Sequence, residues 1–169
     1  MFYAISGING DYEAYKRALK KLKFQNLDDI KEEDIMNEEA VISTLEGEDV
    51  LYVLGNIIGA GGGSMKILQD MMSRDNVIAV VGENEYKITQ ALKALNDHIQ
   101  STGEVPPQML VDKITSMLGE ELSGAVEEFL QLDDEEREDV IEYIDEISEE
   151  AFLEAVSYTH LTLPTNSRV

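Results

Sequence analysis

The 169-residue sequence contains no cysteine, no tryptophan and only three prolines, and its 13 lysines and arginines face 35 aspartates and glutamates. Without a thiol the chain cannot form a disulfide scaffold or a thiolate metal site. The formal net charge of −22 and the isoelectric point near 4.2 argue against a nucleic-acid partner, because the phosphates would be repelled. No apolar run approaches the about 20 residues of a membrane span, so we expect no membrane partner either.

The N-terminus also lacks the features of a signal peptide. Met1 is followed by Phe-Tyr-Ala-Ile-Ser, with no basic stretch and no long apolar run, so the expected compartment is the cytoplasm. The hydrophobic fraction of 43% is ordinary for a folded protein. The acidic residues concentrate in two segments, with ten of them in 28–49 and sixteen in 120–154. For the second segment we favour a solvated helix face over the alternative, a binding role.

Three short apolar runs predict β-strands at residues 2–6, 50–54 and 77–81. Their nearly continuous apolar character is typical of parallel strands that are buried on both faces. Each run ends in a glycine-containing turn, and apolar residues at helical spacing follow each turn. The sequence therefore predicts an α/β fold with a parallel βαβαβ sheet core flanked by helices. In such sheets the loops at the carboxyl ends of the strands form the ligand crevice.

The remaining segments complete the predicted domain. Residues 26–47 interrupt the strand–helix pattern and predict an acidic insertion. The C-terminal region is predicted to be helical, with helices at 108–117 and 120–130 and a last one that starts near Asp133. Residues 156–169 abruptly lack acids and resemble translated sequencing-adapter sequence. We therefore expect one domain over 1–155 and a non-native tail over 156–169.

The three glycine loops resemble the motifs of a known enzyme family. They read Ser6-Gly7-Ile8-Asn9-Gly10, then Gly55-Asn56-Ile57-Ile58-Gly59-Ala60-Gly61, then Gly82-Glu83-Asn84-Glu85. They are similar to Asp-x-His-Gly, Gly-Asp-x-x-Asp-Arg-Gly and Gly-Asn-His-Glu of the calcineurin-like metallophosphoesterases, and most of all to bacterial serine/threonine protein phosphatases. The resemblance implies the N-terminal half of a metallophosphoesterase-like fold. It also implies a hydrolase of phosphoproteins that uses two divalent metals, Mn, Fe or Zn.

The metal-binding residues that the resemblance implies are replaced in this chain. The first metal-binding aspartate falls on Gly7, and its histidine ligand falls on Asn9. The aspartate that bridges the two metals falls on Asn56, and the asparagine ligand falls on Glu83. Two adjacent divalent cations need anionic oxygens between and around them. These positions are therefore not expected to hold the two metals, although Glu83 could still bind a hard cation such as Mg²⁺ or Ca²⁺, and Asp11 nearby could do the same.

The catalytic positions are replaced as well. The aspartate that orients the catalytic histidine falls on Gly59, the substrate-binding arginine on Ala60, and the catalytic histidine on Asn84. An asparagine cannot act as a proton donor near neutral pH, and an alanine cannot make a bidentate contact with phosphate. The residues of the family motifs are retained at Glu85 and at the structural glycines, which are Gly10, Gly55, Gly61 and Gly82.

These replacements lead to two functional hypotheses. In the first, the chain is a degenerate, non-catalytic member of the family that needs no cofactor and acts as a binding or regulatory module for a protein or phosphoprotein. In the alternative, it is a metal-dependent phosphoester hydrolase with residual activity. The run Gly59–Gly63 before Ser64 also invites a phosphate-binding loop. It lacks the lysine of a Walker loop, so we interpret it as a flexible loop with Ser64 as the helix N-cap.

Overall fold

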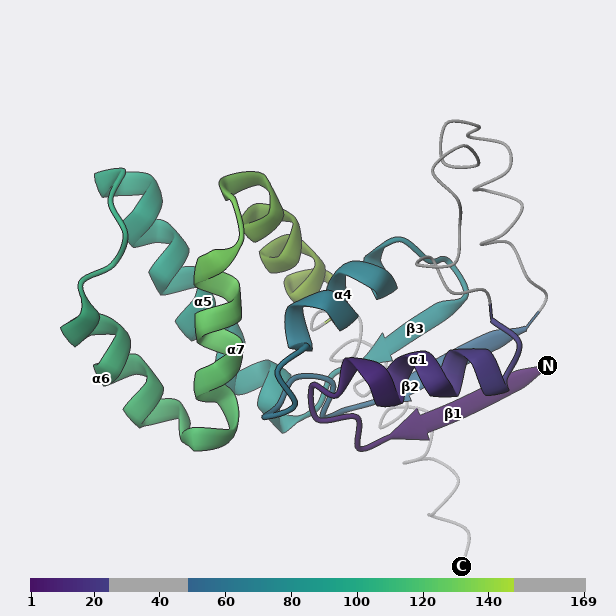
Figure 1. The fold of residues 1–169 in the computed structure, drawn as a ribbon. Coiled ribbons are helices and arrows are strands. Elements are labelled where there is room, and N and C mark those ends of the chain that lie inside the picture. The colour runs from purple at the N-terminus through teal and green to yellow at the C-terminus, as the bar shows by residue number, and fades with distance from the viewer. Residues whose placement is uncertain (25–48, 148–169) are drawn as a thin grey trace, which may run out of the picture.

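The computed structural model describes residues 1–24 and 49–147 of the chain (Figure 1). The predicted acidic insertion at 26–47 and the predicted tail at 156–169 lie outside these residues. A parallel sheet forms one half of the described part, and a group of helices forms the other half. No helix among residues 1–24 and 49–147 is both long and apolar enough to cross a lipid bilayer.

The sheet has three parallel strands in the order β1-β2-β3. They are β1 (Phe2–Ser6), β2 (Val50–Leu54) and β3 (Val77–Val80). In the register, Leu51 of the central strand lies opposite Tyr3 on one side and Val77 on the other. The predicted parallel α/β arrangement is confirmed, and the carboxyl ends of all three strands meet at one edge of the sheet.

The prediction that both faces of the sheet are buried is wrong. The helices α1 (Tyr12–Lys21) and α4 (Ser64–Met72) lie over one face (Figure 1). The side chains that point toward this face are buried in β2 and β3; they are Leu51, Val53, Val77 and Ala79. On the other face Phe2 is 75% exposed, Leu54 45% and Ile78 38%. The strands alternate between a buried and an open side because no described helix covers the second face.

The helix predicted after the third strand and the helices of the C-terminal region are confirmed. They are α5 (Glu83–Thr102), α6 (Gln108–Leu118), α7 (Glu120–Gln131) and a helix at 134–147, where the described residues stop. Apolar residues at spacings of three and four form the buried stripe of each helix, as in Ile88, Leu92 and Leu95 of α5. The bounds of α6 and α7 and the start of the last helix lie within one or two residues of those predicted.

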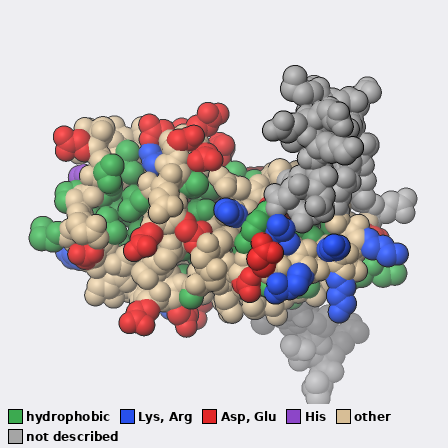
Figure 2. Space-filling model, in the orientation of Figure 1, with side chains coloured by type: hydrophobic (Ala, Val, Ile, Leu, Met, Phe, Trp, Pro, Cys, Tyr) green, Lys and Arg blue, Asp and Glu red, His purple; other side chains and the backbone are tan. Residues whose placement is uncertain are grey.

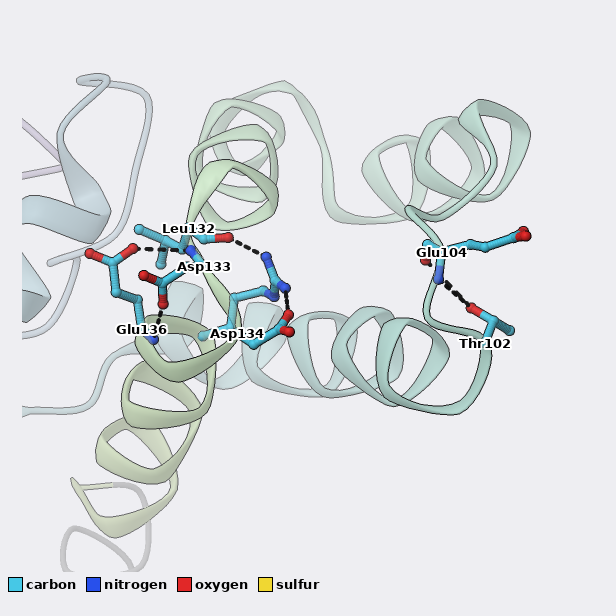
Figure 3. Close-up of polar contacts among 7 residues, drawn as sticks. Thr102, Glu104, Leu132, Asp133, Asp134 and Glu136 are labelled. Atoms are coloured by element: carbon cyan, nitrogen blue, oxygen red, sulfur yellow. Dashed lines mark hydrogen bonds and ion pairs between the residues drawn. The ribbon is translucent and has the colours of Figure 1, made fainter.

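The helix at 134–147 begins at a reciprocal cap (Figure 3). The backbone N–H of Glu136 donates to the Asp133 side chain at 2.9 Å, and the Asp133 N–H donates to the Glu136 carboxylate at 3.0 Å. This capping box satisfies two N–H groups that a helix start otherwise leaves unpaired. Figure 3 also shows the Thr102 hydroxyl accepting the Glu104 N–H at 3.2 Å, just beyond the end of α5.

A buried polar cluster of α1, α4 and the residue Arg74 just after α4 holds these two helices together. The Tyr15 hydroxyl donates to Asp70 Oδ2 at 2.6 Å, and Arg74 donates from Nε to Oδ2 at 2.7 Å and from Nη2 to Oδ1 at 3.1 Å. Burial, together with the neighbouring Asp70 carboxylate, raises the pKa of the Tyr15 hydroxyl. The tyrosine is therefore a neutral donor in this cluster at any physiological pH.

Candidate functional site

The first and second strand-end loops are joined through their backbones, and the third joins them through side chains. The Asn9 N–H donates to the Asn56 carbonyl at 2.7 Å, and the Gly10 N–H donates to the Ile57 carbonyl at 2.8 Å. The Gly61 N–H donates back to the Asn9 carbonyl at 2.8 Å. The structure thus brings the predicted loops together, as parallel strands require. Ile57 and its neighbour Ile58, which belong to the second loop, are fully buried.

Asn9 and Asn56 adopt a left-handed backbone conformation, with φ of +51° and +48°. Few residues other than glycine tolerate this region, and asparagine is among those that do. Gly7, with φ of +73°, adopts it as well. The Asn9 side chain donates to the Gly7 carbonyl at 3.3 Å. Glycine and asparagine at these three positions therefore suit the left-handed backbone of the turns, independently of any role in binding a ligand.

Asn84 and Glu83 occupy the first turn of α5 but differ in their partners. The Asn84 side chain donates to the Ile58 carbonyl at 3.2 Å, which ties the third loop to the second. The Glu83 carboxylate is exposed and lies 2.5 Å from Lys87 Nζ on the same helix. This ion pair lowers the pKa of Glu83. Asn84 is thus part of the loop junction, whereas the charge of Glu83 is engaged with Lys87.

Gly59 and Ala60 lie at the contact between the first and second loops. Gly59 is buried, and a β-carbon added to it would lie 2.7 Å from backbone atoms of Asn9. Ala60 is exposed, and its methyl group offers neither charge nor hydrogen bond. The glycine is therefore required for close approach of two backbones.

We expect Gly59→Ala to destabilise the protein by about 1–3 kcal/mol, because the added methyl group forces two hydrogen-bonded backbones apart. Urea denaturation followed by circular dichroism measures the change. Gly124→Ala in α7 is the matched control, since a β-carbon there meets no atom within 4 Å, and alanine raises helix propensity. Equal midpoints for the two variants would contradict the packing role of Gly59.

Glu85 is the hydrogen-bond centre of the loop junction. Its side chain is fully buried. Oε1 accepts the N–H groups of Ile57 at 2.7 Å and Ile58 at 2.8 Å, and Oε2 accepts the N–H of Gly82 at 2.8 Å. The sequence marks Glu85 as a residue shared with the family motif but does not indicate this role. The available signal was its position three residues after Gly82, the spacing of a capping box.

Asp11, the other acid that could hold a cation, has a structural partner too. Its Oδ1 accepts the Ala14 N–H at 2.9 Å and so caps the start of α1. Across residues 1–24 and 49–147, no three His, Cys, Asp or Glu side chains are arranged to hold a metal ion. The carboxylates nearest the strand ends, on Asp11, Glu83 and Glu85, therefore bind to the protein's own N–H and ammonium groups.

The glycine-rich run does not present a free helix N-terminus to a ligand. The Met65 N–H, in the first turn of α4, donates to Glu128 Oε2 of α7 at 2.9 Å. The predicted N-cap role of Ser64 is wrong, because Gly63 occupies that position. The Ser64 hydroxyl instead bonds both the N–H and the carbonyl of Gly59 at 3.2 Å. A carboxylate of the chain itself thus occupies the place where a phosphate would bind.

We expect Glu128→Gln to flatten the pH dependence of stability. Burial raises the pKa of Glu128, and the Met65 and Ser64 N–H groups and Lys66 lower it by less. A raised carboxyl pKa means that folding favours the protonated form, so this stabilisation is complete below the ordinary value of 4.5 and is lost as the pH rises through the folded value. When the pH is lowered from 7 to 5, the free energy of unfolding of wild type should therefore rise relative to that of Glu128→Gln.

Urea titrations at the two pH values measure this difference. Glu127→Gln, a change at the exposed neighbouring residue, should follow the wild-type pH dependence. If wild type instead lost stability relative to Glu128→Gln on acidification, burial would not dominate at this carboxyl group.

Comparison of the chain with family models, curated proteins and solved structures finds no significant match. The resemblance to metallophosphoesterases therefore depends on the three loop motifs and their order, and it remains a prediction. The geometry adds that these loops meet and that their polar groups bond mostly to each other.

Proposed function

We propose that this chain is a non-catalytic relative of the metallophosphoesterases that acts as a binding or regulatory module for a protein partner. The observation that carries the proposal is the environment of Glu83, the one acid at the four implied metal-ligand positions: its carboxylate is exposed and is paired with Lys87 of the same helix. The other three implied ligand positions are Gly7, Asn9 and Asn56, and none of them offers an anionic oxygen.

The chemistry of the surrounding positions supports the same proposal. Gly7 has no side chain, Ala60 has only a methyl group, and Asn9, Asn56 and Asn84 are neutral amides. A metal-bound hydroxide mechanism needs anionic ligands and a proton donor. The loop junction supplies neither from these five positions. Its backbone hydrogen bonds favour a rigid scaffold instead.

A combined metal and activity measurement tests the proposal. We expect less than one equivalent of Mn, Fe or Zn per purified chain, an unchanged melting temperature on addition of Mn²⁺, and no Mn²⁺-dependent hydrolysis of p-nitrophenyl phosphate. A metal that binds only the folded state would have to raise the melting temperature. About two metals per chain, or a Mn²⁺-dependent rate, would instead favour the residual hydrolase.

Two variants make the activity measurement specific. A contaminating phosphatase would leave the rate unchanged in Glu83→Ala, whereas a rate due to this chain would fall. Glu104→Ala is the matched control, since Glu104 is also exposed and lies beyond the far end of α5. A rate lost in Glu83→Ala and kept in Glu104→Ala would overturn the proposal.

A further inference from the structure

A groove between α5 and α6 differs from the strand-end loops in its chemistry. It encloses about 400 Å³. Its apolar lining consists of Ala91 and Ala94 from α5 and Ile114, Met117 and Leu118 from α6. Met117 is 79% exposed. A hollow of this size with an apolar lining accommodates several side chains of a ligand.

The helices around the groove explain its shape. On one side of the α5–α6 pair, α7 packs against both helices. Among the described elements no helix lies in the groove. Ala91 and Ala94 have short side chains, so the axis of a bound helix can come close to α5. Met117 adds a flexible and polarisable side chain, which is common at surfaces that bind apolar helix faces.

The groove lining holds no acidic residue, but the charge of the helical half that carries it selects the kind of partner. Residues 83–147, which build the helical half, contain 18 acids and four bases. Figure 2 shows acidic side chains over this half and basic side chains gathered over α1. Lys87, the cation on the groove wall, is already paired with Glu83. The acidic half therefore attracts a cationic partner and repels an anionic one.

We propose that the α5–α6 groove binds a basic amphipathic helix of a partner protein. The apolar face of that helix would lie on the alanines and on Ile114 and Met117, and its lysines and arginines would point away from the groove lining toward the acids of the helical half. A second copy of this chain, at −22, and an anionic membrane surface would both be repelled. The inference rests on the proposed binding role and specifies the partner class for it.

A synthetic peptide of leucine and lysine provides the probe. It has about 14 residues, or four helical turns, with the leucines on one face. Fluorescence anisotropy of the labelled peptide measures its affinity for the full chain. Two control peptides are used: one of the same composition with leucine and lysine alternating, and one with glutamate in place of lysine. We expect both controls to bind at least tenfold more weakly.

Two methionine variants locate the binding site. Met117→Gln should weaken binding about tenfold, because the apolar side chain that the bound peptide would bury is replaced by a polar one. Met109→Gln should leave it unchanged, since Met109 lies on the same helix and is 83% exposed but does not line the groove. Ala94→Phe, which fills the groove, should abolish binding. Melting curves of all three variants verify that each is folded.

Several results would overturn the inference. They are equal binding by Met117→Gln and Met109→Gln, equal affinity for the glutamate peptide, a dimer in sedimentation that Met117→Gln dissolves, and binding to phosphatidylserine vesicles that Met117→Gln removes. The last two results would assign the groove to a second copy or to a membrane. Because the readout is peptide binding, a failure here leaves the metal and hydrolysis results for the proposed function unaffected.

Discussion

Asp70→Ala is expected to lower the free energy of unfolding by about 3–5 kcal/mol. Tyr15 is fully buried, and Asp70 and Arg74 are only 7% and 5% exposed. Without the carboxylate, the Arg74 guanidinium stays buried with no counter-charge, and the Tyr15 hydroxyl loses its acceptor. Such a loss is a large fraction of the total stability of an ordinary domain, about 5–15 kcal/mol.

Urea denaturation monitored by circular dichroism measures this loss. Asp75→Ala is the control, since Asp75 is an exposed acid shortly after α4; its midpoint should match wild type. Replacing both charged partners, as Asp70→Leu with Arg74→Met, should recover most of the stability, because no unpaired charge then remains. Tyr15→Phe should cost about 1 kcal/mol. If the double variant were as unstable as Asp70→Ala, the unpaired guanidinium would not be the cause.

Glu85→Ala is expected to destabilise the protein by about 3–5 kcal/mol as well, since the N–H groups of Ile57, Ile58 and Gly82 all lose their acceptor. Glu85→Gln should fall between this variant and wild type. Its one carboxamide oxygen can still accept from Ile57 and Ile58, but its NH₂ group would face the Gly82 N–H, and two donors repel.

Hydrogen exchange measured by NMR distinguishes a local effect from global unfolding. In Glu85→Gln the Gly82 amide should exchange faster while amides in the core of α5 remain protected. Glu83 lies two residues before Glu85 and is exposed. Glu83→Ala should therefore leave the exchange rates of the loop amides and the melting temperature unchanged. Unchanged protection at Gly82 in Glu85→Gln would contradict the clamping role of Glu85.

Most of the fold could be predicted because its signals are local. The strand-to-helix turns carry glycines, and the stripe of Ile88, Leu92 and Leu95 follows the period of an α-helix. The start of the last helix also has a local cause, since Asp133 and Glu136 are three residues apart. Neither the strands nor the helices needed knowledge of distant contacts.

The open sheet face could not be predicted for a different reason. Phe2, Leu54 and Ile78 belong to apolar runs that look alike whether a second layer covers them or not. Burial depends on which other elements pack there, and strand composition does not encode this. An apolar run thus indicates a strand more securely than it indicates two buried faces.

The sequence predicts where the candidate site lies but not which contacts its side chains make. The meeting of the loops follows from parallel topology. The roles of Glu85 and Glu128 depend on contacts with residues 27 and 63 positions away, which no local pattern reveals. The asparagines at positions 9 and 56 were interpreted as lost ligands, and the structure gives them a second cause, their positive φ angles. The family assignment itself remains a prediction.

The sheet face that no described helix covers relates the acidity of this protein to its tendency to self-associate. At neutral pH a charge of −22 keeps copies apart although Phe2, Leu54 and Ile78 are exposed. Near the isoelectric point of about 4.2 that repulsion vanishes, and concentrated salt screens it. Among the described residues, the apolar face and the edges of β1 and β3 then become free to associate. The surplus of carboxylates is thus expected to keep the protein monodisperse at neutral pH, and self-association is expected to increase toward the isoelectric point.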